Sequence, residues 1–325
     1  MSKTLTGNNS NWIRNIHFMH KENQQGLLAI LGANIIFGLN IPVTKALVAQ
    51  WMTPIGYTTI RMFFGTLVFW AASLLMRSEK VHRNDLVLMF IGGLMGFLGT
   101  QFLFSLSLEY TSPVVFSLIM ALTPAVVLLL SAMILREAIP ARKITGIILG
   151  ISGAALIILL GKSNSENGAH GALGILFAFL CVLCYSGYLV LTRRISVKYQ
   201  PVTVAKWMFL VSAVAVFPFS TTVLNEQAMF TESTALLPYV LLAFALLFST
   251  TLAFFLMPFA LKRLEASVVS IFMNLQPIIA SVVAMVVGQD SLTWDKPLAA
   301  ILVLAGVYFV STERLSKRKP VVLNA

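Results

Sequence analysis

Residues 102–153 of this chain read FLFSLSLEYTSPVVFSLIMALTPAVVLLLSAMILREAIPARKITGIILGISG, and residues 255–306 read FLMPFALKRLEASVVSIFMNLQPIIASVVAMVVGQDSLTWDKPLAAILVLAG. A shift of 153 residues aligns the two stretches without a gap. Matches that are rare by chance in so apolar a sequence hold this register: Ser117/Ser270, Met120/Met273, Pro124/Pro277, Lys143/Lys296, Gly153/Gly306 and the acidic pair Glu137/Asp290. We infer that the chain is an internal duplication, and such a repeat decides the architecture of the whole chain.

The composition is that of a membrane protein. Hydrophobic residues make up 58% and charged residues 11% of the 325 residues, whereas charged residues are about 25% of a typical soluble domain. Apolar runs of about 20 residues, the length of a membrane-spanning helix, recur between short polar segments. They predict an all-α membrane protein with ten transmembrane helices, at residues 27–47, 55–76, 86–106, 113–135, 143–161, 171–192, 203–223, 236–260, 267–287 and 297–312.

The basic residues are distributed unequally between the two ends of these helices. Of the 23 Lys and Arg residues, Lys45, Arg61 and Lys206 lie within predicted helices, Lys162 and Lys296 lie on one face, and the remaining eighteen lie on the opposite face. Positive residues are retained in the cytoplasm, so we predict a multi-pass protein of the cytoplasmic (inner) membrane with both termini cytoplasmic. The net charge of +11 is then a topology signal, and nucleic acid is not expected as a partner.

Each half of the chain contains five predicted spans, an odd number, so the second half must be inverted relative to the first. Two inverted five-helix repeats are the arrangement that gives alternating access in secondary transporters. We place the repeats at residues 26–161 and 171–312, joined by a polar linker at 162–170. Residues 1–25 and 313–325 are predicted to be cytoplasmic tails, and the first is expected to be disordered or, alternatively, a short amphipathic helix on the membrane surface.

The predicted fourth and ninth helices carry equivalent stripes of small, sulfur-containing and polar side chains, each with a proline in mid-helix. Lipid surrounds the bundle, so polar groups within spans should face inward, and interrupted helices at matching positions of two halves point to a transport site. We predict a mid-depth cavity between the first, third, fourth, sixth, eighth and ninth helices. The candidate substrate-binding residues, whose polar members could alternatively form interhelical hydrogen bonds, are Asn34, Asn40, Gln101, Ser117, Met120, Tyr185, Tyr188, Asn274 and Gln276. The candidate gating or helix-breaking residues are Pro42, Lys45, Arg61, Pro124 and Pro277.

Two of these residues are cations inside predicted helices. Lys45 and Arg61 either attract a substrate carboxylate or anchor an extracellular gate by bonding backbone carbonyls freed near Pro42, and we prefer the structural role. Glycines at positions 92, 93, 96 and 99 allow another backbone to approach closely. We expect this packing within the chain, so the protein is predicted to be a monomer or a weak dimer.

The sequence carries no signature of enzymatic chemistry. Cys181 and Cys184 lie inside an apolar helix rather than at the strand-to-helix turn of a redox CxxC motif, and we interpret them as small core residues. All four histidines lie in predicted loops or the first tail, and the sequence has neither an HExxH motif nor a GxxxxGK[ST] phosphate-binding loop. We therefore expect no metal ion and no cofactor, and neither an intramembrane enzyme nor a primary pump.

Several short segments resemble the drug/metabolite transporter superfamily, and within it the ten-helix exporters with two EamA-type repeats. These segments are FGLNIPVTK at 37–45, TIRMFF at 59–64, ALTP at 121–124, LRE at 135–137, NLQP at 274–277 and GQD at 288–290. The resemblance covers about residues 26–312, with Phe37-Gly38 in place of the family's usual Trp-Gly and Asp290 in place of its usual Glu. It implies the ten-helix fold and membrane transport, and it says little about the substrate.

The sequence thus predicts a secondary transporter that exports small metabolites by alternating access. All twelve acidic residues lie in predicted loops, helix ends or tails, whereas exporters that exchange protons for cations typically use a membrane-embedded carboxylate. Neutral, zwitterionic or anionic small molecules, amino acids among them, are therefore the expected substrates. Drugs or sugar- and nucleotide-type metabolites are the alternative, and a scaffold without transport would leave the mirrored polar stripes unexplained.

Overall fold

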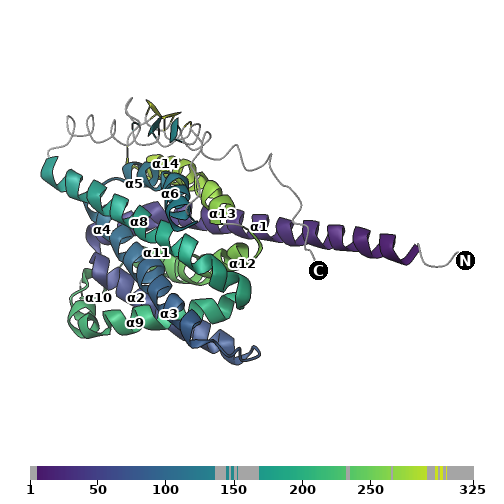
Figure 1. Ribbon diagram of the computed structural model, residues 1–325. Coiled ribbons are helices and arrows are strands. Elements are labelled where there is room, and N and C mark those ends of the chain that lie inside the picture. The colour runs from purple at the N-terminus through teal and green to yellow at the C-terminus, as the bar shows by residue number, and fades with distance from the viewer. Residues whose placement is uncertain are drawn as a thin grey trace, which may run out of the picture.

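The computed structural model describes residues 6–135, 168–231, 235–264 and 266–290, with isolated positions between 144 and 152 and between 297 and 305. Regular structure in these residues is helical throughout (Figure 1). The elements of the first half are α1 (Thr6–Gln50), α2 (Pro54–Leu74), α3 (Arg83–Gly92), the π-helix η1 (Gly93–Gly99), α4 (Thr100–Tyr110), α5 (Pro113–Met120) and α6 (Thr123–Leu135). Those of the second half are α8 (Gly168–Lys198), α9 (Pro201–Asn225), α10 (Ala228–Thr231), α11 (Leu237–Phe244), the π-helix η2 (Ala245–Ala253), α12 (Phe254–Arg263), α13 (Ala266–Phe272) and α14 (Leu275–Val286).

Seven of the described segments are long and apolar enough to cross a membrane. They are Asn23–Gln50, Arg83–Tyr110, Pro113–Met133, Gly171–Lys198, Pro201–Ser220, Leu237–Arg263 and Val268–Val286, and each coincides with a predicted span. The predicted span 55–76 corresponds to α2, which is not among the seven, although its 21 residues extend over about 31 Å as a helix. The predicted spans 143–161 and 297–312 lie outside the described residues except at isolated positions. The chain is therefore an all-helical, multi-pass membrane protein, and the number of ten spans stays a prediction.

The N-terminal segment differs from the disordered tail that we expected. The helix α1 begins at Thr6 and continues to Gln50 over 45 residues, so that it extends beyond the bundle (Figure 1). Residues 8–25 include no proline and no glycine, the two residues that most disfavour a helix interior. The helix can therefore propagate from the first span into a more polar segment.

The second helices of the two halves run in opposite directions. The beginning of α2 meets the end of α9, because a Cβ atom placed on Gly56 would overlap the side chain of Gln227. Near the other ends of the two helices, the rings of Phe69 and Phe209 stack with centroids 5.3 Å apart. α2 and α9 are the second helices of their halves and pack antiparallel, as inverted repeats require.

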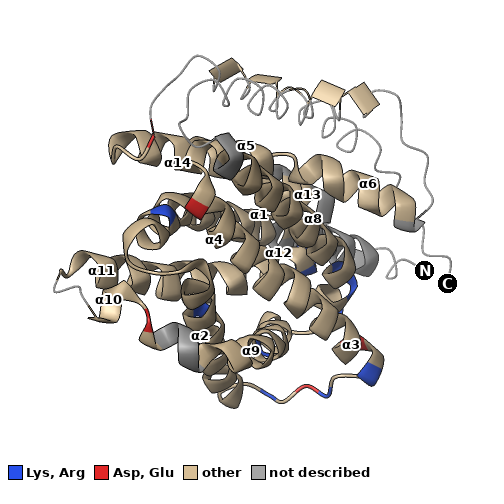
Figure 2. Ribbon diagram, turned by 90° about the vertical axis from the view of Figure 1, so that its left-hand side faces the viewer, with Lys and Arg blue, Asp and Glu red and all other residues tan. Residues whose placement is uncertain are grey.

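The remaining helices exchange partners between the halves in the same way. α1 packs against η2, α12 and α14 of the second half, and α8 packs against η1, α4, α5 and α6 of the first half. Figure 2 shows α1 and α4 in the middle of the bundle, with α2 and α9 on one side and α5 and α14 on the other. The first helix of each half thus lies deep in the opposite half, where it can contribute to a shared central site.

Irregular backbone occurs at matching positions of the two halves. Moving η1 forward by the 153-residue repeat places it within η2. The predicted fourth helix is broken between α5 and α6, just before Pro124, and the predicted ninth helix is broken between α13 and α14, just before Pro277. A proline in the first turn of a helix loses no intrahelical hydrogen bond, so each proline begins a new helix segment instead of kinking an existing one.

The glycines of the third span are used for packing inside this chain. A Cβ atom on Gly96 would overlap the ring of Tyr188 in α8, and a Cβ atom on Gly93 would lie 2.7 Å from the carbonyl oxygen of Met208 in α9. These positions therefore require glycine because other helices of the same chain lie against them, in agreement with the prediction from their spacing.

Candidate functional site

A small cavity lies where helices of the two halves cross. Its volume is about 40 Å³, room for a few water molecules. The first half lines it with Phe37, Asn40 and Ile41 of α1, Thr100, Gln101 and Phe104 of α4, and Phe116 and Met120 of α5. The second half lines it with Cys181 and Tyr185 of α8, Met273 at the break between α13 and α14, and Gln276 of α14.

Five of the predicted substrate-binding residues line this cavity, namely Asn40, Gln101, Met120, Tyr185 and Gln276. The other four lie elsewhere. Ser117 donates to the Val114 carbonyl oxygen of its own helix at 2.9 Å, Tyr188 packs edge-on against Phe97, and Asn274 lies at the first position before α14. Asn34 is in the layer behind the wall. The predicted eighth span, residues 236–260, was expected to line the cavity and contributes no residue to it.

Asn34 fixes the orientation of the Gln276 side chain. The Asn34 Nδ2 donates to the carbonyl oxygen of Ile30 at 2.8 Å, which leaves Asn34 Oδ1 as an acceptor. Gln276 Nε2 donates to that oxygen at 2.6 Å. This bond joins α1 to α14, and therefore one half of the bundle to the other, directly behind the cavity.

Asn40 is held by a second polar cluster. Its Nδ2 donates to Thr44 Oγ1 at 3.2 Å, the Tyr57 hydroxyl donates to Asn40 Oδ1 at 3.4 Å, and the Thr44 and Tyr57 hydroxyls lie 2.9 Å apart. All three residues are buried. Both ends of the Asn40 amide therefore have partners within the protein.

Arg61 is a fully buried cation next to the cavity wall. Its Nε donates to Thr250 Oγ1 at 2.8 Å, one terminal nitrogen donates to Ser249 Oγ at 2.9 Å, and the other donates to Gln101 Oε1. The guanidinium carbon also lies 5.2 Å from the ring centroid of Tyr57, within the range of a cation–π contact. Within the described part of the chain no carboxylate contacts Arg61, so neutral oxygens and a ring replace the solvation of its charge.

Ser249 and Thr250, the hydroxyl partners of Arg61, both belong to the π-helix η2. The Thr250 hydroxyl donates to the carbonyl oxygen of Ala245, five residues earlier, at 2.9 Å. In the first half, the Thr100 hydroxyl likewise donates to the carbonyl oxygen of Met95, five residues earlier, at 2.9 Å. π-Helical turns are rare and frequent at functional sites, and here one immediately precedes cavity-lining residues while the other holds the buried cation.

Lys45 and Pro42 follow the cavity-lining residues of α1 and do not line the cavity themselves. Lys45 Nζ donates to the carbonyl oxygens of Leu108 at 2.7 Å and Glu109 at 3.5 Å, in the last turn of α4. A cation is favoured there because carbonyl groups at a helix C-terminus lack intrahelical partners. The Pro42 carbonyl oxygen accepts from Gln289 Nε2 at 2.9 Å. Lys45 thus bonds carbonyls, as we preferred, but those of α4 and not those freed near Pro42.

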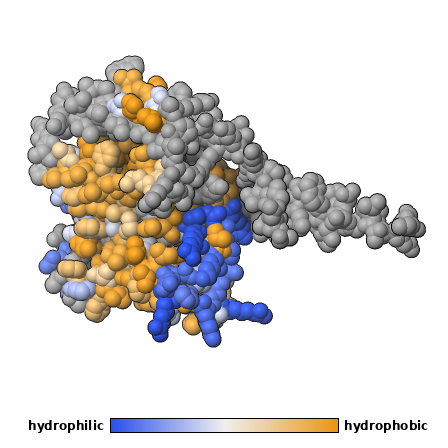
Figure 3. All heavy atoms as spheres, viewed as in Figure 1, coloured by the Kyte–Doolittle hydropathy of each residue, from blue (hydrophilic) through white to orange (hydrophobic). Residues whose placement is uncertain are grey.

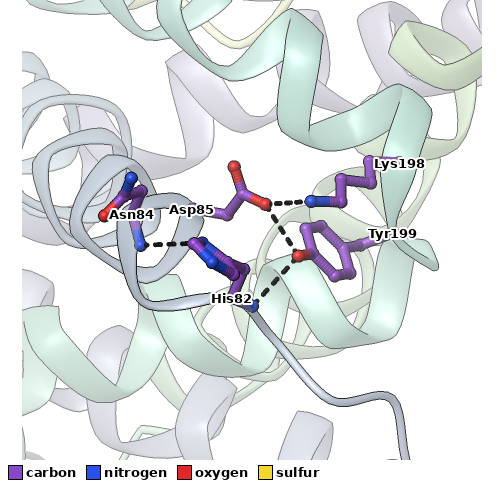
Figure 4. Close-up of polar contacts among 5 residues, drawn as sticks. All are labelled: His82, Asn84, Asp85, Lys198 and Tyr199. Carbon is purple, nitrogen blue, oxygen red and sulfur yellow. Dashed lines mark hydrogen bonds and ion pairs between the residues drawn. The ribbon is translucent and has the colours of Figure 1, made fainter.

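A polar cluster lies at the opposite end of the third span (Figure 4). Asp85 Oδ2 in the first turn of α3 accepts from Lys198 Nζ at 2.5 Å and from the Tyr199 hydroxyl at 2.8 Å. The Tyr199 hydroxyl in turn accepts from the His82 backbone N–H at 3.2 Å. The cluster connects the start of the third span to the end of the sixth.

The surface distinguishes the two ends as well. On the face drawn in Figure 3 the surface is mostly apolar, and its largest hydrophilic patch lies on the side where α3 begins and α8 and α12 end in Figure 1. The exposed cations at this end are Arg77, Lys80, Arg83, Arg194 and Lys198. These belong to the set of basic residues that predicted the cytoplasmic face.

Several cavity-lining residues were missed by our sequence analysis. Phe37, Phe104 and Phe116 form apolar walls, and nothing in the pattern distinguishes them from aromatic residues that face lipid. Met273 could have been found, because it is the repeat partner of Met120. Cys181 is buried as expected of a core residue, and its thiol donates to the Thr100 carbonyl oxygen at 3.4 Å, but it also lines the cavity.

Comparison with known proteins agrees with this architecture. The chain matches the EamA-like transporter family over residues 24–159 and 172–312. It is 25% identical to the uncharacterized transporter YyaM of Bacillus subtilis, over 87% of this chain and 92% of the relative, and 25% identical to an uncharacterized transporter of Archaeoglobus fulgidus, over 82% and 91%. It is 22% identical to the uncharacterized inner membrane transporter YicL of Salmonella typhimurium, over 89% and 96%.

A solved crystal structure has a similar fold. It superposes with a TM-score of 0.58 at 20% sequence identity, and the match covers 87% of this chain and 98% of the other. The family and these relatives are named as transporters and not as enzymes. Because the two family matches together extend over most of the sequence and meet near the predicted linker, the chain belongs to the EamA-like transporter family, whose repeat it contains twice.

Proposed function

We propose that this protein is a secondary transporter of the inner membrane that exports small metabolites, amino acids among them, by alternating access between its two inverted halves. The observation that carries the proposal is the cavity at the crossing of α1 and α4 with α8 and α14, which both halves line. Transporters with inverted repeats bind their substrates at such an interface and move one half against the other around it.

The helix breaks and π-helices support movement around this cavity. Met120 and Met273 line the cavity at the ends of α5 and α13, where regular hydrogen bonding stops. Irregular backbone at membrane depth is tolerated only where protein or a water-filled cavity surrounds it. Polar clusters at the two ends, around Asp85 at one and Lys45 at the other, are suited to open alternately while the cavity stays in place.

The cavity lining favours small substrates that are not simple cations. Its polar side chains are amides and hydroxyls, its apolar side chains are aromatic or contain sulfur apart from Ile41, and no lining residue is acidic. A lining that is mostly apolar with a few placed polar groups is typical of sites for small organic molecules. At about 40 Å³ the cavity must widen to admit one, as a change between occluded and open states would allow. Drugs and sugar- or nucleotide-type metabolites are the alternative substrates, and flux measurements can rank them against amino acids.

Flux measurements in proteoliposomes test the function. Vesicles containing the full-length protein are loaded with an unlabelled amino acid, and entry of the same labelled amino acid by exchange is compared with entry into protein-free vesicles. We expect exchange above the protein-free rate for at least one small apolar amino acid. Exchange of a quaternary ammonium dye without exchange of any amino acid would overturn the proposed substrate class. Exchange of none of the amino acids, dyes, drugs, sugars or nucleotides would overturn transport itself.

A further inference from the structure

We propose that the cavity has a hydrogen-bond donor pole at Gln101 and an acceptor pole at Gln276, and that buried Arg61 fixes the donor pole so that the site selects a carboxylate-bearing, zwitterionic substrate. This inference rests on the proposed function and specifies which chemical groups of the substrate the site recognises. Gln101 and Gln276 belong to opposite halves of the bundle and line the same cavity. A substrate held between them contacts both halves at once.

The donor pole follows from the chemistry of Arg61. A guanidinium group has only N–H donors and no acceptor, so the Gln101 atom facing Arg61 must be the side-chain oxygen, as observed. The Gln101 amide nitrogen is then directed away from Arg61. Among the described residues no protein group accepts from that nitrogen, and Gln101 lines the cavity. The nitrogen therefore presents its N–H groups to a bound molecule.

The acceptor pole follows by the same reasoning from a backbone carbonyl. The Ile30 carbonyl can only accept, so Asn34 Nδ2 faces it and Asn34 Oδ1 faces Gln276. The Gln276 nitrogen must then donate to Asn34, which leaves Gln276 Oε1 as the atom without a donor among the described residues. Gln276 also lines the cavity, so its oxygen can accept a hydrogen bond from a substrate ammonium group.

The charge of Arg61 adds a preference that two neutral amides alone could not supply. Arg61 is 0% exposed, and in the described ranges no carboxylate neutralises it. Attraction between charges is far stronger away from water than in it, and the hydrogen bond from Arg61 polarises the Gln101 amide, which strengthens its remaining N–H donors. Arg61 is thus a positioning residue: it acts on the substrate through Gln101 and through its field.

Matched ligands test the two poles on the purified full-length protein. Each set consists of an amino acid, its carboxamide without the carboxylate, and the acid without the ammonium group: alanine, alaninamide and propanoate; leucine, leucinamide and 4-methylpentanoate; phenylalanine, phenylalaninamide and 3-phenylpropanoate. Ligand-induced shifts of the melting temperature give relative affinities. Both ligands can accept a hydrogen bond from the Gln101 N–H groups, but bonds to a charged acceptor are roughly twice as strong as bonds to a neutral one. We therefore expect the carboxamide to bind roughly 10-fold more weakly than the amino acid.

Gln101→Glu is the decisive variant. The new carboxylate pairs with Arg61, which keeps the side chain in place, but its second oxygen turns the donor pole into an acceptor and neutralises the charge of Arg61. We expect the preference for the amino acid over its carboxamide to disappear, with a melting temperature no lower than that of the wild type. Gln101→Met serves if the Glu variant does not fold. It removes the donor pole but leaves the charge of Arg61, so it should reduce the same preference without reversing it. Gln50→Glu, at an exposed position at the end of α1, adds the same charge and should leave the ranking unchanged.

The outcomes separate this inference from the proposed function. If wild-type protein exchanges an amino acid and binds its carboxamide equally well, or if Gln101→Glu keeps the wild-type ranking, the protein is a transporter without the poles and the inference is wrong. If the wild type neither binds nor exchanges any of the nine compounds, the proposed substrate class fails and the inference fails with it. Loss of the preference in Gln101→Glu and its retention in Gln50→Glu would support the inference.

Discussion

Lys198 Nζ lies 2.5 Å from Asp85 Oδ2 and joins the end of α8 to the start of α3, yet the two side chains differ greatly in exposure, at 54% and 7%. An ion pair with one solvent-exposed partner contributes little to stability. The buried partner, Asp85, depends instead on the Tyr199 hydroxyl, which donates to the same carboxylate oxygen at 2.8 Å (Figure 4). The structural contribution of this cluster therefore lies mainly in Asp85 and Tyr199.

We predict that Asp85→Asn lowers the melting temperature more than Lys198→Met. The first change weakens the bonds from both Lys198 and Tyr199, whereas the second leaves the bond from Tyr199 intact. Melting curves at low and high salt provide the measurement, because salt screens an exposed ion pair and leaves a buried hydrogen bond largely unaffected. Equal losses for the two variants, both abolished by salt, would show that the ion pair and not the tyrosine holds this end together.

Substitution of Gly96 should be costly, because its missing side chain is what allows α8 to approach η1. A Cβ atom at this position would overlap the ring of Tyr188, and overpacking of a core typically costs about 1–3 kcal/mol. We expect Gly96→Ala to lower the melting temperature and to reduce exchange in proteoliposomes. Gly171→Ala is the matched control, since nothing lies within 4 Å of a Cβ there; a similar loss in both variants would mean that the contact with Tyr188 is not the cause.

The predicted topology can be tested independently of the substrate. Fusions of a compartment-sensitive reporter after Ser165 and after Pro320 should report the outside and the cytoplasm, respectively. The physical basis is the retention of basic segments in the cytoplasm, together with five spans in each half. If the fusion after Ser165 reports the cytoplasm, the first half contains an even number of spans and the inverted-repeat assignment is wrong.

The fold could be predicted from the sequence largely because the chain contains two copies of one pattern. Pro124 and Pro277 keep the same register over 153 residues, and the structure places a helix break before each of them. The length of the apolar runs identified seven spans that the structure describes. In a membrane, the length and polarity of a segment decide whether it can cross the bilayer as a helix. Neither η1 nor η2 was predicted, since a π-helix has no simple sequence period.

The candidate site was predictable only in part. Asn40, Gln101 and Gln276 could be identified as polar groups that must face inward, and all three line the cavity. Asn34 satisfies the same rule and lies one layer behind, because an inward-facing amide can bond another helix as readily as a substrate. Which of these occurs depends on the rotation of each helix by a fraction of a turn, and hydrophobic patterning does not determine the rotation of a helix that is apolar on most sides.

Cys181 offers a direct test of alternating access, because it is a thiol in the cavity wall that is 0% exposed in this structure. With Cys184 replaced by serine, Cys181 is the only cysteine in the chain. If the two ends open alternately, a membrane-impermeant thiol reagent should label Cys181 slowly in right-side-out vesicles and also in inverted vesicles, and a bound substrate should slow labelling in both.

Asp85→Asn should accelerate labelling in inverted vesicles only, since it weakens the end that we assign to the cytoplasm. The Cys181→Ser variant in the same background gives the unlabelled baseline. If Cys181 were labelled from one side only, and Asp85→Asn did not change the labelling rate, the cavity would have a single permanent entrance. That result would exclude alternating access.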